Sequence, residues 1–210
     1  RGLHAGDMKY LDLDGNNKIE QTVSANDIKD QRIIGNSLPR YTYSIRLNAE
    51  WNGIDFSVFF QGVGKQDWYP SSDAFAFWGP YSSPAPSFIP KDFLADVWSV
   101  DNPDAYFPRP RGYIAWTDGR SLSSVNNRYL QSLAYCRLKN LTVGYTLPVK
   151  WLSKIHVQKA RLYFSGENLL TLDRLDTDYI DPEAAAAGTN WKTGKTNALS
   201  YPFSKTYSFG

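Results

Sequence analysis

The residues best suited to chemistry are oxygen-bearing groups that recur at every second position near the start of the chain. They are Asp12, Asp14, Asn16, Lys18 through its backbone carbonyl, and Glu20. Calcium-binding loops use this spacing, with an apolar anchor at the position that Ile19 occupies here. The pattern predicts a structural calcium site, and the alternative is a solvated turn rich in Asp and Asn.

The match to a calcium loop is incomplete at two positions. The sixth position is Asn17 where Gly is usual, although Asn tolerates the left-handed conformation required there. The twelfth position is Val23 where a bidentate Glu is expected. We expect a nearby carboxylate to complete the shell, and the candidates are Glu20, Asp27 and Asp30.

A second group of acidic residues lies near the end of the chain: Asp173, Asp176, Asp178, Asp181 and Glu183. Two carboxylates at a suitable separation could hydrolyse a glycosidic bond, but a sequence does not give that separation, and a solvated loop is the simpler interpretation. The histidines are His4 and His156, and neither stands in a motif with a nucleophile or a metal ligand. We therefore expect no enzymatic activity.

The elements that must position these residues are β-strands, and the clearest prediction is a hairpin over residues 41–62. Asn52 and Gly53 suit a two-residue turn because both tolerate a positive φ. Apolar and polar side chains alternate on either side of this turn. The turn predicts four apolar pairs, Trp51 with Ile54, Ala49 with Phe56, Leu47 with Val58 and Ile45 with Phe60. It also predicts the polar pairs Glu50 with Asp55, Asn48 with Ser57 and Ser44 with Gln61, and one mismatch, Arg46 with Phe59.

Further strands are expected over residues 131–168, as a pair with a short link and a bulge near Lys139, and at 202–210, where a last strand begins. Residues 1–40, 63–130 and 169–201 are left as long loops. Successive links of an up-and-down sheet fall at alternate ends, so the short links share one end and the long loops the other. Outer-membrane β-barrels have this asymmetry, with short periplasmic turns and long external loops.

Composition narrows the class of protein. The chain has 210 residues, 42% of them hydrophobic, and a mean hydropathy of −0.46. No apolar run approaches the ~20 residues of a membrane-spanning helix, which excludes a helical membrane protein. The net charge of +2, with scattered Lys and Arg, argues against a nucleic-acid partner. Cys136 is a single cysteine and cannot form an internal disulfide, and because no signal peptide opens the chain we expect an N-terminal part to be missing.

Aromatic side chains and prolines are concentrated in the loop over residues 63–130. Trp and Tyr offer flat apolar faces with a polar edge, which suit sugar rings or protein surfaces. The loop is predicted to contact a substrate or a lid protein through Trp68, Tyr69, Trp78, Tyr81, Trp98 and Trp116. For any one of these side chains the alternative is a place in the loop's own small core.

Several motifs, in order along the chain, resemble the C-terminal part of SusC/RagA TonB-linked outer-membrane transporters. They are GDMKY at 6–10, DLDG at 12–15, IGNSLPRY at 34–41, FFQG at 59–62, RLKNLTVGYTLP at 137–148, GENLLT at 166–171, DPE at 181–183 and YPFSKTY at 201–207. The resemblance covers essentially the whole chain. It implies an all-β, antiparallel, up-and-down transmembrane barrel of roughly 22 strands with a plug, of which this chain carries about the last five.

The resemblance also implies a function and partners. It implies import of an oligomer, a glycan in the first place and a peptide as the alternative, across the outer membrane of a Bacteroidetes-type Gram-negative bacterium. The implied partners are the remaining barrel and plug, a SusD-like surface lipoprotein, membrane lipid, and TonB acting through the missing N-terminal part. In this interpretation the barrel lumen is lined by Arg46, Asn48, Arg161, Tyr163 and Glu167, and the Asp12 loop lies at the external end.

Two other classes of protein remain open. A soluble, calcium-stabilised β-sandwich that binds carbohydrate would show the same alternation, but would bury Tyr43, Ile45, Leu47, Phe56 and Val58 against a second sheet. A secreted glycosidase fragment would depend on carboxylates such as Asp176 and Asp181. The solvent that meets the apolar side of the hairpin distinguishes the transporter from the sandwich.

Overall fold

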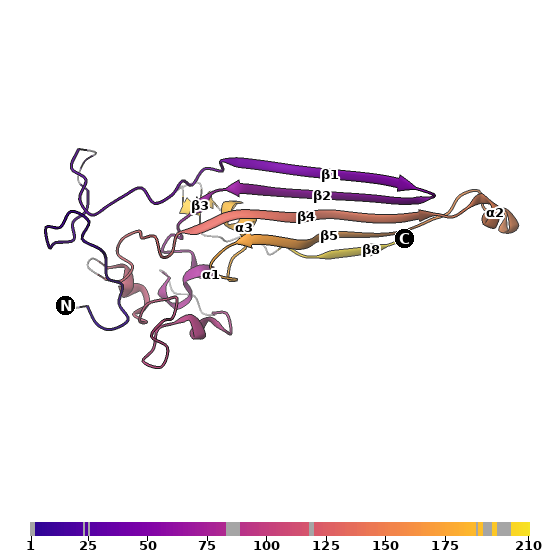
Figure 1. Ribbon diagram of the computed structural model, residues 1–210. Helices are drawn as coiled ribbons and strands as arrows, with labels where there is room; N and C mark the ends of the chain where they lie inside the picture. Colours follow the sequence, from indigo (N-terminus) through magenta and orange to yellow (C-terminus); the bar gives the residue numbers. More distant parts are fainter. Residues whose placement is uncertain are drawn as a thin grey trace.

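The computed structural model describes residues 3–22, 24, 26–82, 89–117, 120–187, 189–190, 195–196 and 203–210. An antiparallel sheet contains the long strands β1 (Tyr41–Trp51), β2 (Ile54–Lys65), β4 (Gln131–Thr146) and β5 (Arg161–Arg174), and the short β8 (Thr206–Phe209). The strands pair in the order β1-β2-β4-β5-β8, and β3 (Asp67–Trp68) pairs with β4. The predicted all-β, up-and-down arrangement is confirmed (Figure 1).

Short helices and one small strand pair lie in the connections. They are α1 (Phe75–Trp78), η1 (Gly79–Tyr81), η2 (Phe93–Asp96), η3 (Gly112–Trp116), α2 (Val149–Leu152), η4 (Ser153–Ile155), α3 (Pro182–Ala187), and the strands β6 (Thr189–Asn190) and β7 (Lys195–Thr196). Within the described ranges, no helix has the length and apolar character needed to cross a bilayer.

The β1–β2 hairpin has the register that the sequence predicts. Trp51 pairs with Ile54 and every predicted pair follows, through Ile45 with Phe60 and Ser44 with Gln61. Asn52 and Gly53 have φ angles of 49° and 82°, as a tight hairpin turn requires. The mismatched pair is not a conflict, because the Arg46 guanidinium lies 5.1 Å from the centre of the Phe59 ring as a cation–π contact.

The predicted bulge near Lys139 is confirmed, and a second irregularity lies in β5, which is longer than expected. The β4 register skips Lys139, since Phe59 pairs with Asn140 and Phe60 with Leu138. In β5 the pairing resumes beyond Asn168, which has a positive φ of 53°. This left-handed residue interrupts the alternation, which is why the predicted strand ends at 168, and β5 continues beyond it to Arg174. β2 also runs past its predicted end, to Lys65.

The two ends of the sheet differ as predicted. Figure 1 shows the β1–β2 turn and α2 at one end, and the long connections with the indigo N-terminal segment at the other. The N-terminal segment is held at that end by backbone contacts with residues of the 63–130 loop, because the Arg109 N–H donates to the Gly6 carbonyl at 2.6 Å.

The sheet has one face of apolar side chains, which we call the apolar face. In-register rows bring together, strand by strand, Tyr43, Ile45, Leu47, Trp51, Ile54, Phe56, Val143, Leu162, Tyr207 and Phe209, all of them exposed. Leu47 is 56% exposed although it lies in the middle of β1. Val58, which lies between Leu47 and Leu141 in the same row, is 6% exposed and is the buried member of the set expected on this face. Among the described residues the only other sheet is the two-residue pair β6–β7, so no second sheet covers this face and the β-sandwich alternative is wrong.

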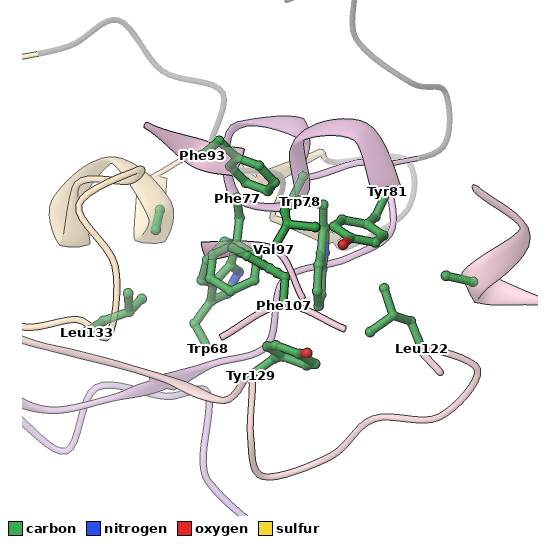
Figure 2. Packing of buried hydrophobic residues seen from close by; sticks show 13 residues of the cluster. Trp68, Phe77, Trp78, Tyr81, Phe93, Val97, Phe107, Leu122, Tyr129 and Leu133 are labelled. Carbon is green, nitrogen blue, oxygen red and sulfur yellow. The ribbon is translucent and has the colours of Figure 1, made fainter. Parts of the chain in front are cut away.

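The hydrophobic core lies outside the sheet, in what we call the aromatic unit, built from residues 67–135 with support from the 175–185 segment. Figure 2 shows side chains from several loops converging on Phe77, Trp78 and Phe107. The Phe77 and Trp78 rings meet edge to face at 4.7 Å, and Phe93 stacks on Phe107 at 4.8 Å. The Tyr81 hydroxyl is buried but donates to the Pro108 carbonyl at 2.6 Å, so its polar atom stays hydrogen-bonded.

Candidate functional site

Three carboxylates in the Asp12 loop are placed to hold a cation. One oxygen each from Asp12, Asp14 and Asp30 lies within 4.8 Å of the other two. The loop closes around Asp12, whose two oxygens accept the N–H groups of Gly15 and Asn17 at 2.6 Å. Asn17 has a φ of 65°, the left-handed conformation predicted for the sixth position. Clustered carboxylate oxygens on a tight turn fit a hard cation such as Ca²⁺.

Of the three candidates for completing the shell, Asp30 is the one that lies beside Asp12 and Asp14. Backbone N–H groups of Glu20 and Leu13 donate to its carboxylate at 2.7 Å, and these bonds lower the pKa of Asp30. Asp27 instead pairs with Lys29 at 3.2 Å.

Two of the remaining predicted ligands, Asn16 and Glu20, bind each other within the turn. The Asn16 amide donates to the Glu20 carboxylate at 2.9 Å, and the Asn16 carbonyl oxygen accepts the Lys18 N–H at 2.8 Å. Val23, the twelfth position, lies outside the described residues.

The polar residues predicted to line a lumen share the face of the sheet opposite the apolar face, here called the polar face. Asn48 accepts a hydrogen bond from the Ser57 hydroxyl at 2.8 Å. Arg161 reaches from β5 across β4 to bind Asp55 of β2 through two bonds of 2.8 and 2.5 Å. Gly144 lies beneath this ion pair, and a Cβ atom there would collide with both side chains. The face is therefore built from polar groups that bond across strands.

A cluster around Arg137, which we call the Arg137 cluster, was not foreseen from the sequence. Arg137 belongs to β4, its side chain is 1% exposed, and it donates to Thr171 of β5 and Glu183 of α3 at 2.8 Å and to Asp181. Lys139 also donates to Glu183 at 2.8 Å. The guanidinium and the Lys139 ammonium lie 4.6 and 4.8 Å from the centre of the Phe203 ring. The cluster fastens the β5–β8 connection to the sheet.

This cluster accounts for part of the acidic stretch considered above for glycoside hydrolysis. Asp181 and Glu183 bind a buried guanidinium, and Asp181 also accepts the Glu183 and Ala184 N–H groups at 3.0 and 3.1 Å. These contacts make the two carboxylates anchors for α3. The sequence signals were the motifs RLKN at 137–140 and DPE at 181–183, but nothing in them indicates that they meet.

The aromatic residues predicted to bind a substrate or lid divide into two groups. Trp68, Trp78 and Tyr81 are buried in the core of the aromatic unit, at 6%, 0% and 0% exposure, so the prediction of direct contact is wrong for them. These three side chains are buried because a long ordered loop needs a hydrophobic core of its own. Tyr69, Trp98 and Trp116 are half-buried at its margin, where the Trp116 N–H donates to the Tyr81 carbonyl at 2.7 Å.

Comparison with curated proteins identifies the relatives of this chain. It is 32% identical over 211 residues to TonB-dependent receptor P3 and 27% identical over 208 residues to TonB-dependent receptor P26, both of Formosa agariphila. The alignments cover 98% of this chain. The chain is a relative of TonB-dependent receptors and matches one portion of them. It spans about a fifth of the length of these relatives, 18% and 19% respectively.

Solved structures and family models add the following comparisons. The RagAB peptide importer in its open-open state is 22% identical to this chain and superimposes with a TM-score of 0.47. The match covers 76% of this chain and 16% of the importer chain. The RagAB peptide transporter is also 22% identical, with 78% and 17% coverage and a TM-score of 0.49. No family model matches the chain.

The antiparallel strands β1, β2, β4, β5 and β8 form a sheet with one apolar and one polar face. Both outer strands, β1 and β8, leave one edge unpaired among the described residues, as expected of a portion of a larger sheet.

Proposed function

We propose that this TonB-dependent receptor segment forms about the last five strands of a plugged barrel of roughly 22 strands that imports oligomeric nutrients. The cargo is a glycan in the first place and a peptide as the alternative. The receptor works in the outer membrane of a Bacteroidetes-type bacterium, receives cargo from a SusD-like surface lipoprotein at the end with the long loops, and is driven by TonB through the rest of the receptor.

The apolar face carries this proposal. Its in-register rows of Trp, Ile, Leu, Phe and Val side chains run across β1, β2, β4, β5 and β8. Such a surface in water is unfavourable by about 25 cal/mol per Å² of apolar area, whereas hydrocarbon is its natural solvent. We therefore place lipid against the apolar face. The polar face, with Arg46, Asn48, Arg161, Tyr163 and Glu167, then lines the lumen.

The site at Asp12, Asp14 and Asp30 is proposed to bind a structural Ca²⁺ ion at the external end. The three carboxylates supply hard oxygen ligands, and the ion would join the 12–20 turn to residue 30. Binding would stiffen a segment that is otherwise held by hydrogen bonds within the turn and by the bonds of the Leu13 and Glu20 N–H groups to Asp30. The proposed role of the ion is structural and does not include the movement of cargo.

The proposal is tested by placing a charge on each face of β1 in the full-length receptor. Leu47→Arg on the apolar face is expected to destabilise the reconstituted receptor by about 2 to 4 kcal/mol, the range for Arg near the middle of a bilayer. Asn48→Arg is the matched control, because it lies next along the strand on the polar face. Equal effects of the two substitutions, measured by urea unfolding in lipid vesicles, would contradict the proposed orientation.

Cargo is tested by uptake. Cells that produce the receptor are expected to accumulate a labelled oligosaccharide, and to lose this accumulation when TonB is deleted. Accumulation of a labelled oligopeptide instead would select the peptide alternative. Uptake of neither, with the receptor folded in the outer membrane, would refute the import function.

A further inference from the structure

The link between β4 and β5 is a compact turn at the end of the sheet with the short connections. It contains α2 and η4, and Figure 1 shows it projecting beyond the β1–β2 turn. Backbone bonds hold it, with Trp151 N–H to the Pro148 carbonyl at 2.9 Å and Val157 N–H to the Leu152 carbonyl at 3.2 Å. Leu152 is 3% exposed and anchors the turn. The turn is therefore a defined surface.

The outer surface of this turn is both apolar and basic. Val149, Trp151 and Ile155 are 67%, 60% and 65% exposed. Lys150, Lys154 and Lys159 lie between and after them, and none of the three forms an ion pair within the described part of the chain. No Asp or Glu occurs anywhere from 119 to 166. The turn thus has positive charge without internal compensation.

This composition is typical of a segment that lies at a membrane surface. Trp favours the boundary between acyl chains and headgroups because its ring is apolar and its N–H is polar. Lys bends its stem along the apolar layer and places its ammonium among the phosphates. Each Lys near an anionic surface raises the binding constant roughly fivefold, which corresponds to about 1 kcal/mol.

The turn is also continuous with the apolar face. The last row of that face at this end consists of Trp51, Ile54, Tyr145 and Leu162. β4 ends at Thr146, and the chain continues through Leu147 directly into the turn. Trp51 is 75% exposed, so the row has an aromatic residue at its margin. A bilayer against the apolar face would end beside the turn.

We propose that the α2–η4 turn binds anionic phospholipid headgroups of the periplasmic leaflet. Trp151, Ile155 and Val149 enter the boundary of the acyl chains, and Lys150 and Lys154 bind the headgroup phosphates. This inference rests on the proposed function, because it requires the apolar face to meet lipid. The turn would then act as an anchor that fixes how deeply this portion of the barrel lies in the bilayer.

The first experiment locates the turn in the full-length receptor, reconstituted in phosphatidylcholine vesicles with or without phosphatidylglycerol. In a Cys136→Ser background, spin labels are attached at Trp151→Cys or Ile155→Cys, with Gln158→Cys as the exposed polar control on the same turn. Collisions with oxygen report lipid and collisions with a nickel chelate report water. The labels at 151 and 155 are expected to favour oxygen, and the label at 158 to favour nickel.

The second experiment measures charge recognition. Lys150→Gln combined with Lys154→Gln is expected to reduce phosphatidylglycerol retained on the purified receptor by about 25-fold, or about fivefold per lysine. Lys91→Gln, an exposed lysine remote from the turn in sequence, is the matched control and is expected to leave retention unchanged. Equal retention by the double variant and the control would overturn the proposed recognition of anionic lipid.

A label at Leu47→Cys separates failure of this inference from failure of the proposed function. In one outcome the label at 47 collides mainly with oxygen, while the labels at 151 and 155 collide mainly with nickel or, because protein covers them, with neither probe. The turn is then not a lipid anchor, and the proposed barrel orientation stands. If the label at 47 favours nickel, the orientation and the anchor both fail.

Discussion

Removing the Arg137 guanidinium should release α3 from the sheet. Arg137→Met keeps most of the side-chain volume but abolishes the bonds to Thr171, Asp181 and Glu183. A buried guanidinium with two carboxylate partners is the strongest polar link between the β5–β8 connection and β4 in the described part of the chain. The expected result is local opening of α3, with the sheet intact.

The magnitude follows from the exposure of the partners. Removing one member of a fully buried ion pair costs about 3 to 5 kcal/mol, because the other charge stays buried without a partner. Here Asp181 and Glu183 are 30% and 23% exposed, and Glu183 keeps its bonds to Lys139. Water and Lys139 therefore compensate part of the loss. We expect about 2 kcal/mol, which is roughly a 30-fold increase in the open population.

Hydrogen exchange of the full-length receptor measures this opening directly. The Ala185 N–H bonds to the Asp181 carbonyl at 2.8 Å, so its exchange reports α3. Its exchange should be about 30-fold faster in Arg137→Met, while β4 amides near Val143 keep their wild-type rates. Arg46→Met is the matched control, because Arg46 lies on the same face without a carboxylate partner among the described residues. An acceleration below about threefold would refute the assigned role of Arg137.

Three further predictions concern the end of the sheet with the long connections. Burial alone would raise the pKa of Asp7, but the Arg111 guanidinium and the His4 N–H outweigh it and lower the pKa to about 2 from the ordinary 3.8. The contacts of Asp7 are thus complete above about pH 4 and lost as the pH falls toward 2, so the protection factors of the 4–10 amides, which are corrected for the intrinsic pH dependence of exchange, should fall over that window. Asp7→Asn should remove this change in protection. Asp30→Asn should weaken Ca²⁺ binding by at least about tenfold in isothermal titration, whereas Asp27→Asn should not. Phe107→Ala should destabilise the aromatic unit by about 3 to 5 kcal/mol in urea, against less than about 0.5 for Ile33→Ala at a 97% exposed position.

The hairpin could be predicted in full because two local rules agree there. Asn52 and Gly53 select one turn geometry, and the turn together with the two-residue period leaves one register for Trp51 and Ile54. The extension of β5 could not be predicted, since Asn168 in a left-handed conformation breaks the same period. Alternation of apolar and polar residues no longer predicts a strand beyond a residue that adopts an irregular backbone conformation.

The candidate site was predicted where its residues are close in sequence. Asp12 and Asp14 lie in one turn, and Asp30 was among the residues expected to complete it. Arg137 and Asp181 are 44 residues apart, and a sequence gives no measure of such a contact. The Trp residues show a third case, because burial of Trp78 and half-burial of Trp116 depend on how the loop packs as a whole.

The position of the aromatic unit has a consequence for how the strands come together. β2 ends at Lys65 and β4 begins at Gln131, yet these neighbours pair along most of their length. Trp68 and Leu133, at the two ends of the intervening loop, belong to one buried cluster. We expect this cluster to collapse and join the ends before the strands align, which would offset the chain entropy lost on closing the long loop before the first β2–β4 hydrogen bond forms. Weakening the cluster should therefore slow the assembly of the sheet, although most of the sheet lies outside the cluster.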